Sequence, residues 1–205
     1  MDTTARAERA GEIGVIVLAA GESARLGRPK QLIRVGGSTL LRRAARAAIA
    51  AGDRVVVVLG AHADRLGREL EGLDVATVTN DRWPEGMASS IRAGLAALCE
   101  RSAPSAVIVT LCDQPLVGTE ALLRLVDAYR EGGPRVVASS YGGGVGVPAL
   151  FASELFDELS ALEGNAGAKA VIARHAGEGR AVPCPEAELD VDTPEDLKRL
   201  GDAMG

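Results

Sequence analysis

Residues 13–21 read Ile-Gly-Val-Ile-Val-Leu-Ala-Ala-Gly, an apolar run that ends in a glycine. The run is too short for a typical helix, and a continuous apolar pattern is typical of a strand that is buried on both faces. Such strands occur in parallel sheets that helices cover on both sides. The stretch therefore predicts an α/β protein with a mostly parallel sheet.

Segments of strand and helix character alternate along the rest of the chain. We expect strands at residues 55–60, 75–79, 106–112, 136–139 and 180–182, and helices at residues 39–51, 62–71, 87–100, 119–130, 153–162, 166–175 and from Thr193 onward. This alternation implies parallel βαβ units. We therefore predict a single Rossmann-like, three-layer α/β/α domain at residues 13–205, preceded by a disordered polar tail at residues 1–12.

The composition argues against several classes of protein. The 205 residues suffice for one sizeable core, and because aromatic residues make up only 2%, that core should be aliphatic. A net charge of −5 argues against a general nucleic-acid binder. The sequence shows neither a membrane-spanning apolar run nor the pattern of a signal peptide. We expect a cytoplasmic protein without nucleic-acid or membrane partners.

Positive charge is concentrated near the start of the chain, where seven basic residues and one acid lie between Gly21 and Arg46. A local positive field is enough to attract a triphosphate, even in an acidic protein. Arg42, Arg43 and Arg46 have the spacing of neighbours on a helix surface, and we expect them to face solvent.

In open α/β sheets, ligands bind at the carboxyl ends of the strands, so the residues after each strand are the candidates. Residues 18–30 read Leu-Ala-Ala-Gly-Glu-Ser-Ala-Arg-Leu-Gly-Arg-Pro-Lys. The small residues let backbone N–H groups approach phosphate oxygens, Ser23 adds a hydroxyl donor, and Arg25 and Lys30 add charge. The loop matches neither the Walker pattern nor Gly-x-Gly-x-x-Gly. It favours an anion-binding loop, although a plain strand–turn also fits.

Two acidic positions could hold a metal. Asp113 follows the strand at residues 106–112; a hard cation bridging it to phosphates would explain its position, and so would a turn before proline. Asp190 and Asp192 lie two residues apart in an extended segment and can face the same cleft. Both acids also suit the start of the following helix, and for Asp190 we keep that interpretation.

Residues 80–90 read Asn-Asp-Arg-Trp-Pro-Glu-Gly-Met-Ala-Ser-Ser and lead into a helix. Gly86, Ser89 and Ser90 place hydrogen-bond donors at the start of that helix, where they could contact a nucleobase edge. A simple helix cap by one of the two serines fits equally well.

Taken together, these segments resemble the nucleotidyltransferase family typified by molybdopterin cytidylyltransferase and its guanylyltransferase relative. The similarity runs from Val15 to Leu200 and includes, in order, the loop at residues 18–30, Gly-Met-Ala-Ser-Ser-Ile at residues 86–91, Asp-Gln-Pro at residues 113–115 and Asp-Val-Asp-Thr-Pro-Glu-Asp at residues 190–196. The resemblance implies a fold like that of the nucleotide-diphospho-sugar transferases.

The resemblance also implies residue roles. Arg25 would contact the β- and γ-phosphates, Lys30 would stabilise charge at the α-phosphate, and Asp113 with Asp192 would hold Mg²⁺. The nucleotide-binding residues would be Leu18, Ala19, Ala20, Gly21, Ser23, Arg25, Lys30, Gly86, Ser89 and Ser90, and the acceptor-binding residues would be Gln114, Pro115, Gly146, Pro148 and Asn165. At Asn165 the family more often has aspartate.

The activity that the resemblance implies is transfer of CMP from CTP to a molybdopterin-type cofactor, with a molybdoenzyme as a possible client. Three alternatives stay open: nucleotidyl transfer to another phosphate-bearing acceptor, a non-catalytic carrier of the finished cofactor, and an NAD(P)H-dependent reductase.

Overall fold

The computed structural model describes residues 11–132 and 134–204, so most of the expected N-terminal tail lies outside the described residues. Glu12 belongs to the described part. Its carbonyl oxygen accepts a hydrogen bond of 2.9 Å from the Ser105 amide, and its carboxylate pairs with Arg54. The chain is therefore anchored to the body of the protein one residue before the first strand.

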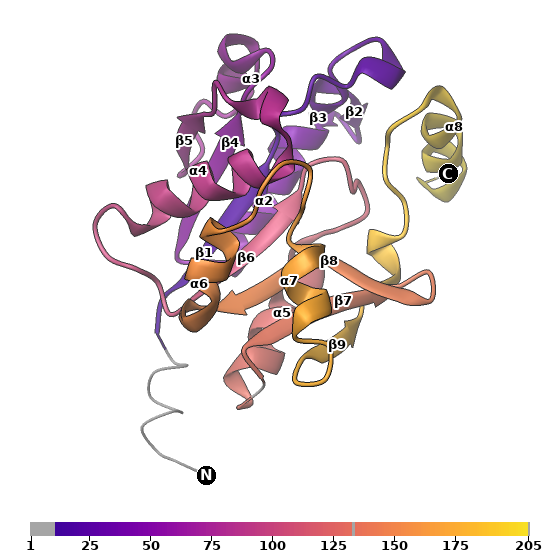
Figure 1. Cartoon of the computed structure of the whole chain (residues 1–205). Coiled ribbons are helices and arrows are strands. Elements are labelled where there is room, and N and C mark those ends of the chain that lie inside the picture. Colours follow the sequence, from indigo (N-terminus) through magenta and orange to yellow (C-terminus); the bar gives the residue numbers. More distant parts are fainter. Residues whose placement is uncertain (1–10, 133, 205) are drawn as a thin grey trace.

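A seven-stranded sheet with strand order β5-β4-β1-β6-β8-β7-β9 forms the centre of the molecule (Figure 1). Its strands are β1 (Ile13–Leu18), β4 (Arg54–Leu59), β5 (Ala76–Thr79), β6 (Ala106–Leu111), β7 (Val136–Tyr141), β8 (Gly144–Ala152) and β9 (Arg180–Pro183). Strand β8 runs antiparallel to both neighbours, and the remaining pairings are parallel. The predicted mostly parallel α/β sheet is confirmed.

Helices cover both faces of the sheet, as the three-layer prediction requires (Figure 1). The α-helices are α2 (Leu40–Ala51), α3 (Ala63–Glu69), α4 (Met87–Cys99), α5 (Thr119–Arg130), α6 (Phe156–Ser160), α7 (Lys169–Arg174) and α8 (Pro194–Met204). Val15 and Val17 of β1 pack with α2, α3 and α5, whereas Ile16 and Leu18 pack with α4, α6 and α7. Alternate residues of this apolar strand thus contribute to two hydrophobic cores, one on each face of the sheet.

Short elements complete the chain. The 3₁₀ helices are η1 (Ala24–Leu26), η2 (Lys30–Leu32), η3 (Trp83–Glu85), η4 (Ser153–Leu155) and η5 (Pro185–Ala187). Strands β2 (Arg34–Val35) and β3 (Ser38–Thr39) form a separate hairpin whose turn residues, Gly36 and Gly37, have φ angles of 58° and 81°. Two consecutive positive φ angles favour glycine, which explains the glycine pair. Among the described residues, no helix is long and apolar enough to cross a membrane.

Candidate active site

The loop after β1 is fixed by a buried amide side chain. Gln31 is 1% exposed, and its Nε2 donates to the carbonyl oxygens of Ala19 at 3.0 Å and Gly21 at 2.7 Å. The Ser23 hydroxyl accepts a hydrogen bond from the Lys30 amide at 3.1 Å and lies 3.3 Å from Gln31 Oε1. Ser23 therefore closes the loop on itself. Gln31 was not predicted, because a buried side chain below a loop leaves no pattern in the sequence.

A pocket of about 350 Å³ opens beside this loop at the carboxyl ends of β1 and β6. Its lining residues are Leu18, Ala19, Ala20, Gly21, Lys30, Gln31, Trp83, Gly86, Met87, Ser90, Leu111, Asp113 and Asn165. Three of the four segments singled out in the sequence thus meet at one pocket, and Asp192 of the fourth reaches it through Lys30.

Lys30 lies between two carboxylates at the edge of this pocket. Its Nζ is 2.5 Å from Oδ2 of Asp113 and 2.6 Å from Oδ1 of Asp192. Arg25 Nη2 contacts the other oxygen of Asp192 at 2.6 Å. The side chains of Lys30 and Asp113 are 15% and 14% exposed, whereas that of Arg25 is 72% exposed. The Lys30–Asp113 pair is therefore shielded from solvent, whereas the exposed Arg25 pair contributes little to stability.

The two carboxylates keep the lysine charged. Burial alone would lower the pKa of the Lys30 ammonium, but the charges and hydrogen bonds of Asp113 and Asp192 outweigh it and raise that pKa above its ordinary value. Burial would raise the pKa of the Asp192 carboxyl, yet its contacts with Lys30 and Arg25 bring that pKa below its usual range. At neutral pH Lys30 is protonated and Asp192 is ionised.

Asp113 and Asp192 also fit a divalent metal. Lys30 Nζ contacts both Oδ2 of Asp113 and Oδ1 of Asp192. The distance between these two oxygens therefore cannot exceed the sum of the two contact distances. Oδ1 of Asp113 is buried and has no hydrogen-bond partner among the described residues, so a lone pair is free for a ligand. Within that part of the chain, no group of three or more His, Cys, Asp or Glu side chains could hold a metal. A Mg²⁺ here would complete its shell with phosphates and water.

The start of α4 contributes a second wall of the pocket. Gly86 has a φ of 112°, and a Cβ there would lie 2.4 Å from the Gly164 carbonyl oxygen, so only glycine fits. Asn80 Nδ2 donates to the hydroxyls of Ser89 at 2.8 Å and Ser90 at 3.0 Å. Ser90 lines the pocket and keeps its own proton as a donor.

Ser89 takes a different position from the one expected. Its hydroxyl lies 2.9 Å from the Arg82 carbonyl and 2.8 Å from the Gly86 carbonyl, and it is not among the pocket residues. The hydroxyl therefore fixes the turn before α4 instead of facing a base.

An aromatic wall of the pocket was not predicted. Trp83, the single tryptophan of the chain, lines the pocket together with Met87 and Leu111. A Cβ on Gly60 would lie 2.9 Å from Trp83 Cγ and 2.8 Å from Ala20 Cβ. The Ala20 methyl and the Trp83 indole thus form one wall of the pocket. A side chain at position 60 would collide with both, which explains the glycine there.

The residues expected on the acceptor side lie beyond the end of β6, within β8, and in the loop between α6 and α7. Gln114 is buried, and its Nε2 donates to the carbonyl oxygens of Val147 at 3.2 Å and Ala187 at 3.0 Å. Its Oε1 is buried without a hydrogen-bond partner among the described residues, which leaves an acceptor next to Asp113 in the sequence. The Pro148 carbonyl accepts a hydrogen bond from Ser139 at 2.6 Å.

Other acceptor-side candidates lie in different surroundings. The Pro115 carbonyl accepts a hydrogen bond of 3.3 Å from Arg43 Nη2, which ties the loop to α2. Gly146 faces Tyr141, whose hydroxyl would lie 2.5 Å from a Cβ there. Asn165 lines the pocket with the glycine-rich loop, and its Oδ1 approaches Gly86. The structure therefore groups Asn165 with the expected nucleotide-binding residues.

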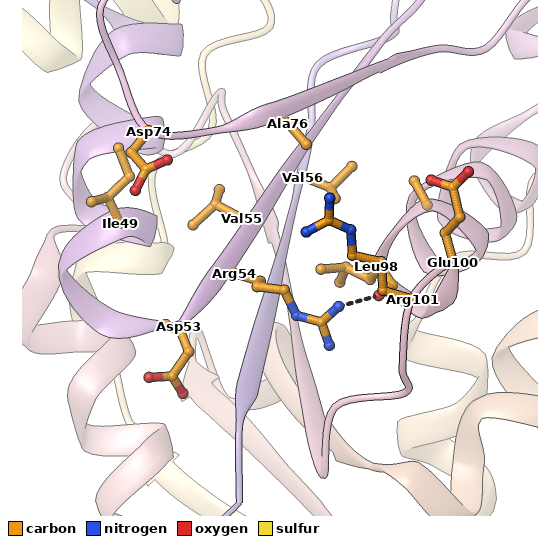
Figure 2. Close-up of a pocket in the computed structure, with 12 residues that line it drawn as sticks. Ile49, Asp53, Arg54, Val55, Val56, Asp74, Ala76, Leu98, Glu100 and Arg101 are labelled. Atoms are coloured by element: carbon orange, nitrogen blue, oxygen red, sulfur yellow. Dashed lines mark hydrogen bonds between the residues drawn. The ribbon is translucent and has the colours of Figure 1, made fainter.

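A larger cavity of about 560 Å³ lies at the opposite end of the sheet, where β4 begins (Figure 2). Its lining includes the acids Asp53, Asp74 and Glu100 and the bases Arg54 and Arg101. In Figure 2, Arg54 donates to the Leu98 carbonyl, at 2.8 Å. This cavity contains none of the expected site residues and lies at the amino ends of the strands, so size alone does not select the active site.

Comparisons with known proteins identify the family of the chain. A family model described as a MobA-like NTP transferase domain matches residues 15–179. Nicotine blue oxidoreductase from Paenarthrobacter nicotinovorans is 32% identical over 197 residues, which cover 90% of this chain and 94% of that protein. Molybdenum cofactor guanylyltransferase from Rhizobium meliloti (strain 1021) is 28% identical over 197 residues, which cover 90% of this chain and 88% of that protein.

A solved structure shows the same fold at comparable identity. The structure of Rv0371c from Mycobacterium tuberculosis H37Rv in complex with manganese has a TM-score of 0.72 and 31% identity, covering 94% of this chain and 99% of that one. The resemblance seen in the sequence motifs is confirmed by these similarities. Because the family model spans most of the chain, this protein belongs to the MobA-like NTP transferase family.

Proposed function

We propose that the protein transfers CMP from CTP to a molybdopterin-type cofactor in a reaction that depends on Mg²⁺. Nucleotidyl transfer is the chemistry of the family to which the chain belongs. The observation that carries the proposal is the position of Lys30 between Asp113 and Asp192, at the edge of a pocket lined by a glycine-rich loop.

The proposed reaction exchanges one phosphoanhydride bond for another. A phosphate oxygen of the acceptor attacks the α-phosphorus of CTP and forms a new P–O–P bond. The bond from that phosphorus to the β-phosphate breaks, and its electron pair leaves with pyrophosphate. Positioning and charge neutralisation suffice for such a transfer, so no nucleophilic side chain is required.

Each residue of the site has a role in this scheme. The loop at residues 18–30 would hold the triphosphate, with Arg25 at the β- and γ-phosphates. Asp113 and Asp192 would hold the metal, which neutralises phosphate charge when it is bound. Lys30 would then exchange its carboxylate partners for the α-phosphate, where charge grows during transfer. Ser90 and Gly86 would face the nucleoside end of the pocket.

The acceptor assignment rests on two observations. The chain is similar over nearly its whole length to a molybdenum cofactor guanylyltransferase. The unpartnered Oε1 of Gln114 offers a hydrogen-bond acceptor near Asp113, which suits a polar group of the acceptor. On this account the product would be handed to a molybdoenzyme in the cytoplasm.

A second candidate function is oxidoreduction, because a relative with 32% identity carries the name nicotine blue oxidoreductase. The loop after β1 lacks the Gly-x-Gly-x-x-Gly pattern of a dinucleotide site, which favours the transferase. A non-catalytic carrier of the finished cofactor would retain the pocket without turnover.

Pyrophosphate release separates these functions. The protein is incubated with CTP or GTP, Mg²⁺ and molybdopterin, and pyrophosphate is measured. Release with CTP that requires the acceptor and is lost in Asp113→Asn supports the proposal. Consumption of NADPH without pyrophosphate release would support the oxidoreductase, and stable retention of cofactor without either reaction would support the carrier.

A further inference from the structure

A third pocket, of about 420 Å³, lies between the β2–β3 hairpin, the start of α2 and the end of α3. Its lining residues are Arg34, Gly36, Gly37, Ser38, Thr39, Arg42, Arg46, Arg68 and Glu69. Four of these side chains are cationic and one is anionic. None of the nine residues lines the pocket beside the glycine-rich loop, so the two pockets are distinct.

The four arginines lack carboxylate partners. Across residues 11–132 and 134–204, none of their guanidinium groups lies within ion-pair distance of a carboxylate. The single acid of the pocket, Glu69, instead accepts a hydrogen bond of 3.1 Å from the Thr39 hydroxyl. The pocket thus carries a net positive charge, and no carboxylate of the described residues pairs with its guanidinium groups.

Two of the arginines are held in place by backbone carbonyls. Arg42 Nη1 donates to the carbonyl oxygens of Glu69 at 2.7 Å and Glu71 at 3.2 Å, which neutralises the carbonyl end of α3. Arg34 Nη1 donates to the Gly37 carbonyl at 3.0 Å across the hairpin turn. The sequence predicted Arg42 to face solvent, but its side chain bridges two elements. Each fixed guanidinium retains further N–H groups that can bind an anion.

A hydroxyl of the same pocket lacks a partner. The oxygen of Ser38 is buried and makes no hydrogen bond with the described residues. Leaving a buried polar group unpaired is unfavourable. Arg46 and Arg68 are exposed at the pocket rim and likewise make no hydrogen bond to that part of the chain. A ligand with several acceptor oxygens would satisfy these exposed guanidinium groups together.

We propose that this pocket is a second anion site, which binds a small phosphate-class oxyanion apart from the nucleotide pocket. Guanidinium groups match the oxygens of phosphate in paired hydrogen bonds, and an oxyanion relieves the repulsion among the four arginines. A hollow formed by three elements suits a small molecule, and the net charge of −5 disfavours a nucleic acid. The proposal goes beyond nucleotidyl transfer and does not depend on it.

The test uses inorganic pyrophosphate and amide NMR spectra of the nitrogen-labelled full-length protein, with EDTA present to remove metal. Glycine amides are well separated in such spectra, so Gly36 and Gly37 report on this pocket while Gly21 and Gly27 report on the nucleotide loop. We expect saturable shifts of Gly36 and Gly37 that weaken at high salt, because exposed charges are screened.

Matched variants localise the binding. Removing Arg46 and Arg68 together should weaken the pyrophosphate affinity reported by Gly36 and Gly37 at least about tenfold, since charge-assisted hydrogen bonds to the anion are lost. Arg65→Ala is the control, because Arg65 is an exposed arginine of α3 outside the pocket and should leave the response unchanged.

Three results would overturn the proposal. Pyrophosphate could leave Gly36 and Gly37 unmoved, the double variant could bind as tightly as the wild type, or a DNA oligonucleotide could shift these amides where pyrophosphate does not. Because no turnover is measured, none of these results bears on the transferase proposal.

Discussion

The Nζ of Lys30 lies 2.5 Å from Oδ2 of Asp113, although the two residues are separated by 83 positions in the sequence. The same nitrogen reaches Asp192, so one ammonium group joins the loop after β1, the end of β6 and the segment before α8. Removing one partner of an enclosed ion pair leaves a charge uncompensated. The lysine thus holds together the two carboxylates that we propose as metal ligands.

Asp113→Asn and Asp192→Asn should each abolish pyrophosphate release, because an amide is a much weaker ligand for Mg²⁺ than a carboxylate. Circular dichroism should show that both variants remain folded. The matched control is Asp190→Asn, because Asp190 is an exposed acid two residues before Asp192. This variant should have a milder effect on pyrophosphate release. Near wild-type turnover of either main variant at saturating Mg²⁺ would remove that residue from the metal site, and complete loss in Asp190→Asn would transfer the role to Asp190.

Lys30→Ala should lower kcat more than it raises KM for CTP. Its proposed partner is charge that develops at the α-phosphate during transfer, and an interaction made in the transition state appears in kcat. Loss of one such donor costs on the order of 10²–10³ in rate. Arg28→Ala, an exposed cation of the same loop, is the control and should change both constants little. A change confined to KM in Lys30→Ala would make Lys30 a general phosphate anchor.

Much of the fold could be predicted from periodicity. The apolar run of β1 was located correctly, and α5 has the expected bounds of residues 119–130. Strand β8 was missed because Gly144, Gly146 and Pro148 interrupt its apolar pattern. The hairpin β2–β3 was read only as a break at Gly36-Gly37, since strands of two residues are too short to show a period.

The site was predictable in its segments but not in its contacts. Small and acidic residues after apolar strands leave a local signal, which led to the loop and Asp113. The alternation of Asp190 and Asp192 in an extended segment led to Asp192. Gln31 and Trp83 become visible only when the chain folds, because their roles depend on backbone groups and pocket walls distant in sequence. The position of Asn165 beside the glycine-rich loop likewise depends on the fold.

Trp83 offers a direct optical measure of nucleotide binding, because it is the single tryptophan and lines the proposed nucleotide pocket. Titration with CTP and Mg²⁺ should change its emission in a saturable way, as a base or ribose alters the environment of the indole. The change in emission should disappear with excess EDTA if the metal bridges protein and phosphates. Constant emission under conditions where calorimetry detects CTP binding would place the nucleoside elsewhere.

Base selection is predicted to depend on Ala20. The wild type should prefer CTP to GTP, because the Ala20 methyl occupies the pocket wall beside Trp83 and a cytosine is smaller than a guanine. Ala20→Gly should narrow the preference by roughly 1–3 kcal/mol, or about 10–200-fold in the ratio of kcat/KM. An unchanged ratio would move base selection to Gly86 and Ser90. A wild type that favours GTP would exclude the cytidylyl assignment.

The fate of the phosphates of CTP tests nucleotidyl transfer most directly. CTP labelled at the α-phosphorus and CTP labelled at the γ-phosphorus are incubated separately with the protein, Mg²⁺ and molybdopterin, and the products are separated by chromatography. The account predicts that the α-label enters a cytidylylated cofactor and that the γ-label appears in pyrophosphate. If the α-label stays in unreacted CTP while the protein is shown to bind both substrates, or if it leaves as free CMP without joining the cofactor, nucleotidyl transfer to this acceptor is contradicted.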